Sequence, residues 1–293
     1  MKRFKFRHFK DRFSSFIFLF PSLLGVLVFF IIPFFIIIEY SIMDNPINRE
    51  FVGLENFKNL MTNKAFITAA KNTAIFSLIS VPSAVVVSLL MAMVLEKNIP
   101  FSSQFRTFLL SPMMVPVASI VLIWRVLFDY NGSMNEFIMN LGMKPIDWFQ
   151  TDFSQLVIVF LFQWKNLGYN MILFMAALAS IPKDVLEVAS MEYTGPLTIF
   201  FKIKIRYLSS TIFFVSLLTL VNSFKVFREI YLLTGDYPYS SLYMLQHFMN
   251  NTFQSLDYQK LSAAAIIMAA VMCVIIGIMF ALDNKYAKDI EEG

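Results

Sequence analysis

The chain has 293 residues, of which 58% are hydrophobic and only 15% are charged, and its mean hydropathy of +0.66 is too high for an ordinary soluble domain. Its net charge of +4 does not indicate a nucleic-acid-binding protein, because the basic residues lie mainly between apolar runs. One cysteine and two histidines leave no disulfide framework and no His/Cys metal cluster, and no GxxxxGKS/T or GxGxxG motif provides a phosphate-binding loop.

Six apolar runs are each long enough to cross a bilayer, which takes about 20 residues of helix. None alternates strictly between apolar and polar residues, so the pattern predicts helices rather than a barrel. The first run is long for a signal peptide and lacks a small-residue cleavage site, so we expect it to remain as a span. We predict a basic tail (1–13), a single transmembrane domain (14–282) and a second tail (283–293), with spans at 14–38, 72–95, 107–128, 154–180, 208–231 and 261–282.

The distribution of lysine and arginine predicts the orientation of these spans. With the N-terminus inside, the inner segments hold 14 of these residues and the outer segments hold 6. Because short cytoplasmic loops carry an excess of Lys and Arg, we expect both termini in the cytoplasm. The segment 181–206 between the fourth and fifth spans then faces the cytoplasm as well.

Several charged residues lie inside or at the ends of spans, where a central charge costs about 2.5–3.5 kcal/mol on insertion scales. They are therefore expected to face a protein interior or a wet cavity. For Arg125, Arg228 and Glu229, near the outer ends, we favour snorkelling or pairing at the interface. Lys165 and Lys225 are the other two charged residues of this group.

Lys165 belongs to a polar and aromatic cluster in the middle of the fourth span, and the fifth span carries a second polar patch. Amides, hydroxyls and aromatic rings together suit a polyhydroxylated solute, because rings stack on sugar C–H faces while amides bond hydroxyls. The alternative is an interhelical hydrogen-bond network that holds the bundle together. The residues are Gln163, Trp164, Lys165, Asn166, Tyr169 and Asn170 on the fourth span, and Thr219, Asn222, Ser223 and Lys225 on the fifth.

The third span contains two prolines, Pro112 and Pro116, in the sequence LLSPMMVPVAS. Each removes a backbone hydrogen bond, so we expect a break in the helix near its inner half. Broken helices often border the substrate path of transporters, although a proline kink can also serve packing.

The segment 181–206 interrupts the apolar pattern. Ile181-Pro182 ends the fourth span, and Asp184 can cap a short amphipathic helix. Gly195-Pro196 then forces a turn, after which LTIFFKIKIR returns to the membrane. A helix, a turn and a second helix predict a knob on the cytoplasmic face that suits docking.

This segment resembles the EAA loop of type I ABC importer permeases, whose consensus is EAAxxDGAxxxxxFxxI. Glu187-Val188-Ala189 stands for E-A-A, Glu192 for the acidic sixth position, and Phe200 and Ile203 for the later apolar pair. Tyr193 stands where the family has its glycine, with Gly195 two residues later, and Arg206 stands where the family usually has proline.

Other stretches resemble the carbohydrate branch of this family, similar to the first membrane subunit of maltose and glycerol-phosphate importers. They follow the family's order over nearly the whole chain. The stretches are FVGLENF (51–57), NTAIFSL, FRTFLLSP, WRVLFDYNGSMN, ALASIPKDVLE and SFKVFREIYLLTGDYP (223–238).

The resemblance implies an all-α membrane protein, a six-helix permease bundle with a cytoplasmic coupling helix. It implies a heterodimer with a second related permease, two cytoplasmic ATPase subunits, an extracellular solute-binding protein and a bacterial plasma (inner) membrane. The solute would be a sugar or oligosaccharide. ATP and Mg would be bound by the ATPases, so we expect no cofactor and no enzymatic site in this chain, and no nucleic acid as partner.

The resemblance also implies site residues. For coupling to the ATPase they are Glu187, Val188, Ala189, Met191, Glu192 and Gly195; Glu187 would pair with a basic residue, and Val188, Ala189 and Met191 would supply apolar contact. For the solute path they are Met113, Val117, Trp164, Gly168, Thr219, Asn222, Ser223 and Val226. The polar cluster described above adds Lys165, Asn166, Tyr169 and Asn170 to the path.

A stand-alone ion-coupled secondary transporter is the main alternative, with Lys165 and Glu229 as its ion-linked groups. It would transport without companion chains. A membrane-embedded enzyme has no support, because the spans contain no nucleophile–base pair and no metal set.

Overall fold

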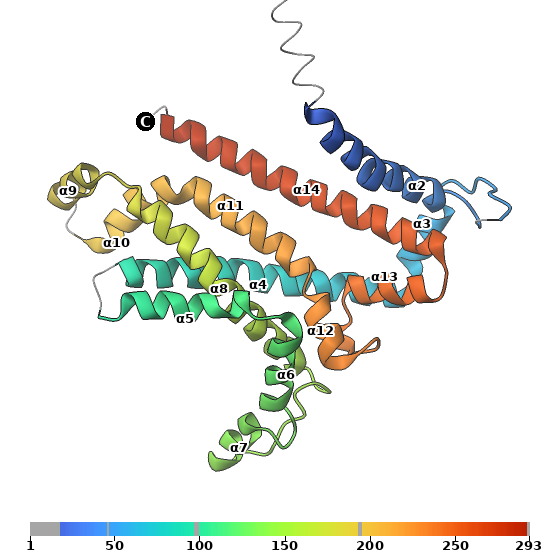
Figure 1. The fold of residues 1–293 in the computed structure, drawn as a ribbon, viewed down its shortest axis with the longest axis horizontal. Helices are drawn as coiled ribbons and strands as arrows, with labels where there is room; N and C mark the ends of the chain where they lie inside the picture. The colour runs from blue at the N-terminus through green and yellow to red at the C-terminus, as the bar shows by residue number, and fades with distance from the viewer. Residues whose placement is uncertain (1–17, 46, 97–99, 193–194, 292–293) are drawn as a thin grey trace, which may run out of the picture. The chain divides into compact units, whose positions relative to one another are not determined.

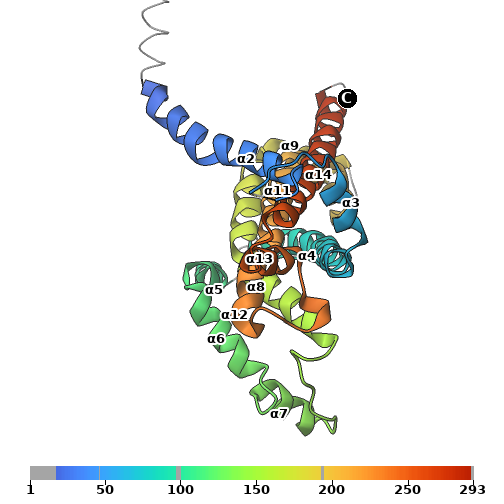
Figure 2. The same cartoon turned by 90° about the vertical axis from the view of Figure 1, so that its right-hand side faces the viewer.

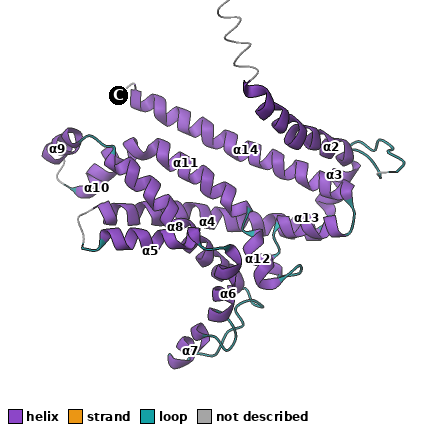
Figure 3. Ribbon diagram, in the orientation of Figure 1, coloured by secondary structure: helices purple, strands orange, loops and turns teal. Residues whose placement is uncertain are grey.

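A computed structural model describes residues 18–45, 47–96, 100–192 and 195–291, with no side-chain detail for 284–291. The basic tail 1–13, the first residues of the predicted first span and Tyr193 lie outside the described residues. Within them every regular element is a helix (Figure 3), and the only strand-like pairing is one bridge between Met43 and Phe51.

The helices follow in order along the chain (Figure 1), starting from a helical stretch Phe18–Ser41 that contains a π-helical turn. Their bounds are η1 (Leu27–Ile31), α2 (Ile32–Ser41), α3 (Glu55–Thr62), α4 (Lys64–Glu96), α5 (Ser102–Met114), α6 (Val117–Leu127), α7 (Ser133–Asn140), α8 (Phe153–Ala179), α9 (Lys183–Glu192), α10 (Pro196–Ile199), η2 (Phe200–Lys204), α11 (Ile205–Phe224), α12 (Phe227–Thr234), η3 (Ser240–Leu242), α13 (Leu245–Gln254) and α14 (Tyr258–Glu291).

Five of the described stretches are long and apolar enough to cross a membrane, and α5 with α6 adds a sixth if the bent pair counts as one span. The five are Phe18–Ser41, Lys64–Glu96, Phe153–Ala179, Pro196–Thr234 and Tyr258–Asp283. These stretches correspond in order to the predicted apolar runs, while the domain boundaries and the orientation in the membrane stay predictions.

The chain divides into two compact units, residues 1–63 with 252–271 and residues 64–251 with 272–293. In the first, the side-chain amide of Asn56 donates hydrogen bonds to the carbonyl oxygens of Ser41 (3.0 Å) and Met43 (2.7 Å). One α3 side chain thereby satisfies backbone groups left open where α2 ends.

The second unit is built around α8, which packs against α4, α5 and α11 (Figure 1). One buried cluster joins α4, α8 and α11 and includes Leu89, Phe174 and Leu208. A second cluster joins α6, α8 and α12 and includes Trp124 and Ile230. The central helix is therefore covered on several sides, which positions its polar residues inside protein rather than in lipid.

The break expected in the third span is present. The span divides at Val115 and Pro116, and α5 and α6 meet at 102° (Figure 2). Val115 is extended, as a residue before proline prefers, and Pro116 has no N–H with which to continue the ladder. Pro112 stays within α5, where the Ser111 hydroxyl donates to the Phe108 carbonyl oxygen (2.7 Å) that Pro112 cannot bond.

The predicted fifth span is interrupted as well. Helix runs without a break from α10 through η2 to the end of α11 at Phe224, stops at Lys225 and Val226, and resumes as α12. The prediction of a span over 208–231 did not include this two-residue interruption, although the stretch Pro196–Thr234 as a whole is long and apolar enough to be one span.

Within its described residues, the segment 181–206 forms helix α9 and a second helical stretch that starts with α10. Asp184 lies in the first turn of α9 rather than before it, so it does not act as the predicted cap, although its charge suits the helix dipole. Gly195 is extended, and α10 begins at Pro196.

Candidate functional site

A cavity of about 360 Å³ lies between α5, α8, α11 and α12, close to the breaks that follow α5 and α11. It falls within the usual range for small-ligand pockets, about 300–1,000 Å³. Its lining combines apolar, amide, phenolic and charged side chains: Met113, Leu161, Phe162, Lys165, Asn166, Tyr169, Leu218, Asn222, Lys225, Val226, Arg228 and Glu229.

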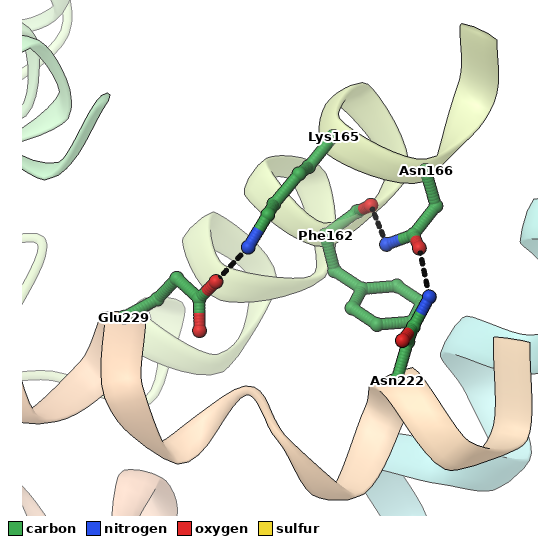
Figure 4. A network of polar contacts seen from close by, with 5 residues as sticks. All are labelled: Phe162, Lys165, Asn166, Asn222 and Glu229. Atoms are coloured by element: carbon green, nitrogen blue, oxygen red, sulfur yellow. Dashed lines mark hydrogen bonds and ion pairs between the residues drawn. The ribbon is translucent and has the colours of Figure 1, made fainter. Parts of the chain in front are cut away.

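An ion pair joins Lys165 of α8 to Glu229 in the first turn of α12 (Figure 4). The Lys165 side chain is 29% exposed and faces the cavity, whereas the Glu229 side chain is 6% exposed. Among the described residues no group bonds the second carboxylate oxygen of Glu229, so this buried charge depends on Lys165. Glu229 is therefore buried and paired within the chain rather than snorkelling, and its depth in the membrane stays a prediction.

Asparagine side chains link α8 to α11 next to this pair. The Asn166 amide donates to the Phe162 carbonyl oxygen (2.8 Å), and the Asn222 amide donates to the Asn166 side-chain oxygen at 3.0 Å (Figure 4). One turn further along α8, the Asn170 amide donates to the Thr219 hydroxyl (3.0 Å). Asn166 and Asn222 also line the cavity, so the network and the cavity share residues.

The structure brings half of the predicted solute-path residues to the cavity. Those that line it are Met113, Lys165, Asn166, Tyr169, Asn222 and Val226.

The other half serve packing. Asn170 and Thr219 are buried in the network, and the Ser223 hydroxyl bonds that of Ser77 (2.9 Å). Val117 and Trp164 pack against the aromatic cluster around Trp124, and Gln163, part of the predicted polar cluster, donates to the Ser80 carbonyl oxygen (3.1 Å). Both readings of the polar cluster therefore apply: Asn166 and Asn222 belong to the cavity and to the network, whereas Asn170 and Thr219 belong to the network alone.

Gly168 lies on the face of α8 that touches α5. A Cβ there would stand 2.0 Å from the Leu109 carbonyl oxygen and 2.5 Å from its carbonyl carbon. Glycine is needed here because two helix backbones meet, as in other closely packed membrane helices.

Sequence reasoning left six lining residues out of the solute path. Nothing in the sequence marks Leu161, Phe162 and Leu218 as cavity residues, because an apolar residue in an apolar run does not show which side of the helix faces the cavity. Lys225, Arg228 and Glu229 did carry a signal, a charge within a span, but their position beside the cavity, next to the interruption between α11 and α12, was not predicted.

Helix α9 presents the residues predicted to couple to an ATPase. Glu187 and Glu192 are exposed, as are Val188 (55%) and Met191 (86%), while Gly195, just before α10, is partly buried. Ala189 is 3% exposed and faces a shallow groove shared with Ile203. Ala189 therefore packs within this chain, and Val188 and Met191 form the apolar part of the free surface.

A histidine is buried outside the spans, on α13. His247 is fully buried against the rings of Phe227 and Tyr243, and its Nδ1 accepts a hydrogen bond from the Met244 backbone N–H (3.3 Å). Burial lowers the pKa of the imidazole from 6.5 to about 4, although the charge of Asp236 opposes this shift.

The lowered pKa of His247 predicts acid sensitivity. Because the unfolded chain takes up the proton near pH 6.5 and the folded chain only near pH 4, stability should be lost as pH falls through that window, by about 3 kcal/mol at most. Between pH 7.5 and pH 4.5, the Tm of the His247→Phe variant in detergent should fall less than the Tm of the parent protein. Equal losses would show that other groups account for the acid sensitivity.

Residues 84–288 match the family described as binding-protein-dependent transport system inner membrane component. The chain belongs to this family. The sn-glycerol-3-phosphate transport system permease protein UgpA of Pectobacterium atrosepticum is 28% identical over 276 residues, 92% of either chain. The sulfoquinovosyl glycerol transport system permease protein SmoG of Agrobacterium fabrum is 30% identical over 231 residues, 77% of this chain and 74% of that protein.

The fold of this transport-system membrane component matches a solved structure. The crystal structure of a bacterial ABC transporter involved in the import of the acidic polysaccharide alginate contains a chain that superposes with a TM-score of 0.84. The match covers 96% of this chain and 98% of that chain at 18% identity. The predicted resemblance to ABC importer permeases and the all-helical permease fold are confirmed. The roles of individual residues stay predictions.

Proposed function

We propose that this membrane component forms the translocation path for a carbohydrate and couples its passage to ATP hydrolysis by separate subunits. The observation that carries the proposal is the cavity beside the middle of α8, where the amides of Asn166 and Asn222 and the ring of Tyr169 meet. Amides can exchange their mutual hydrogen bond for bonds to sugar hydroxyls, and the ring offers a face to C–H groups. Two relatives are named for glycerol 3-phosphate and sulfoquinovosyl glycerol, both polyhydroxylated solutes.

The proposed assembly contains a second, related permease as heterodimer partner, two cytoplasmic ATPase subunits that bind ATP and Mg, and an extracellular solute-binding protein. It would sit in a bacterial inner membrane with both termini of this chain in the cytoplasm, as the Lys and Arg distribution predicts. A solved relative of the same fold is described in complex with a periplasmic protein bound to an alginate pentasaccharide, which supports a binding protein as partner.

Helix α9 is the proposed contact for the ATPase. Its free surface combines the carboxylate of Glu187 with the apolar side chains of Val188 and Met191. Helix α9 contacts α10, which continues through η2 and α11 as one helical stretch that ends at the cavity. Movement of α9 can therefore reach the cavity as a rigid displacement, since packed helices move as units.

The test is purification in mild detergent followed by transport measurements. We expect the chain to co-purify with a second permease and an ATPase, identified by mass spectrometry, and the reconstituted complex to take up sugar only with ATP and binding protein. Uptake by the isolated chain in liposomes, driven by an ion gradient, would contradict the proposal and favour a secondary carrier with Lys165 and Glu229 as ion-linked groups.

Reversing one charge on α9 should break the coupling. Glu187→Lys places a cation where we propose a basic ATPase residue binds, and a like-charge contact at an interface costs about 1.4 kcal/mol or more, a tenfold loss of affinity. ATPase co-purification and ATP-driven uptake should fall accordingly while insertion continues. Glu136→Lys makes the same reversal on exposed α7 and should leave ATPase co-purification unchanged. Equal ATPase co-purification in both variants would remove α9 from the coupling contact.

A further inference from the structure

The cavity carries an excess of positive charge. Three cationic side chains line it, those of Lys165, Lys225 and Arg228, against the single carboxylate of Glu229. That carboxylate already pairs with Lys165. Two positive charges are therefore left over in a space that is otherwise lined by apolar and amide groups.

Lys225 and Arg228 have no acidic partner among the residues that the structure describes. They stand on either side of the interruption between α11 and α12: Lys225 follows the last residue of α11, and Arg228 is the second residue of α12. Both side chains are exposed in this chain. Such charges cannot face lipid without a large cost, so they face either an aqueous path or an anionic group.

Lys165 lies near the middle of α8, too far along the helix for its side chain to reach either membrane surface. Lys165 is the thirteenth of the 27 residues of α8, so about 20 Å of helix extends on either side of it at 1.5 Å per residue. This matches or exceeds half the hydrocarbon thickness of a bilayer, about 15 Å. The ion pair with Glu229 fixes α12 at the same level, and with it Arg228. The excess charge therefore lies beside the middle of α8 rather than beside either of its ends.

We propose that the solute of this importer is an anionic carbohydrate, a sugar or oligosaccharide that carries a carboxylate, phosphate or sulfonate group. Lys225 and Arg228 receive the anionic group, while Asn166 and Asn222 serve the hydroxyls. A cleft of one sign of charge with apolar walls raises the local concentration of its counter-ion, and an arginine fork matches the paired oxygens of these anions. The inference rests on the proposed sugar-transport function and adds the charge of the solute to it.

The competing use for these cations is an ion pair with acidic residues of the second permease. In that case removing the charges would weaken assembly of the two permeases. The solute would then have no reason to be anionic. The experiment therefore measures solute preference and assembly separately.

The first arm offers the complete importer, with its own binding protein and ATPase, a defined mixture of oligosaccharides. The mixture contains oligogalacturonides, their carboxyl-reduced neutral forms, sugar phosphates and sugar sulfonates, and mass spectrometry identifies what is imported. Uptake restricted to the acidic members supports the inference, and the class imported separates carboxylate from phosphate or sulfonate. Uptake of the neutral sugars alone, or of neutral and acidic sugars equally, overturns it. Uptake of none contradicts the proposed sugar transport itself.

The second arm removes the excess charge with K225Q/R228Q and compares it with K144Q, which neutralises an exposed lysine in the loop after α7. We expect K225Q/R228Q complexes to contain both permeases in normal amounts and to import the acidic sugar more slowly by a factor of about ten or more. The uptake rate of K144Q complexes should be unchanged. The charge-conserving K225R/R228K variant should restore most of the uptake. Loss of the second permease from the complex, or unchanged uptake of the acidic sugar, would overturn the inference.

Discussion

Replacing Gly168 by alanine is expected to destabilise the bundle by roughly 3 kcal/mol and to reduce the amount of folded protein in the membrane. The added Cβ would lie 2.0 Å from the Leu109 carbonyl oxygen, which belongs to the α5 backbone and cannot turn aside as a side chain can. Overpacking a close contact costs about 1–3 kcal/mol, and the upper end applies where two backbones must separate. The Tm of the purified protein in detergent and the yield of monodisperse protein measure the effect.

Gly277→Ala is the matched control. Gly277 is also helical, in α14, but a Cβ there would meet nothing within 4 Å. Alanine should then stabilise that helix by about 0.5–1 kcal/mol, because glycine has the greater entropy loss on folding. Opposite signs for the two substitutions are expected, and equal tolerance at both sites would refute the close α5–α8 contact.

The helical fold could be predicted because the bilayer leaves so few alternatives. An apolar run such as 154–180 must satisfy its backbone internally, and the structure has α8 at Phe153–Ala179. The helices of the segment 181–206 could be predicted in the same way, since Pro182 follows the end of α8 and Pro196 opens α10, where a proline fits by local sterics. Local chemistry was sufficient where it acts within a few residues.

The break in the third span was expected from its two prolines, but which proline ends the helix, and at what angle, could not be predicted. Pro112 and Pro116 remove the same kind of hydrogen bond, but only the second one ends a helix. The difference lies in what surrounds them: Ser111 supplies a local substitute donor beside Pro112, and α6 packs against α12 after a turn of 102°. An angle set by tertiary packing has no signature in the residues of the break.

The site shows a similar division. Composition identified a polar cluster on α8, but not which members face the cavity: Asn166 lines it, and Asn170, one turn away, is sealed against Thr219. The pairing of Lys165 with Glu229 joins positions 64 residues apart and depends on how α8 and α12 pack. Sequence shows that a charge needs a partner, whereas the fold decides which one.

Breaking the Lys165–Glu229 pair is expected to be costly in an asymmetric way. Lys165→Met leaves the Glu229 carboxylate, 6% exposed, without its only ionic partner among the described residues, which should cost about 3–5 kcal/mol. Glu229→Gln leaves a lysine that is 29% exposed and faces the cavity, where water can solvate the ammonium group. Its cost should be smaller, about 1–3 kcal/mol. The Tm values of the two single variants in detergent test whether Lys165→Met is the more destabilising substitution.

The double variant Lys165→Met/Glu229→Gln separates the pair from its two members. If the damage in Lys165→Met comes from a buried carboxylate without a partner, neutralising that carboxylate should restore most of the lost stability. The double variant should then be more stable than Lys165→Met alone, although it carries one substitution more. Additive losses in the double variant would show that the two side chains stabilise the bundle independently, which is incompatible with the geometry of the pair in Figure 4.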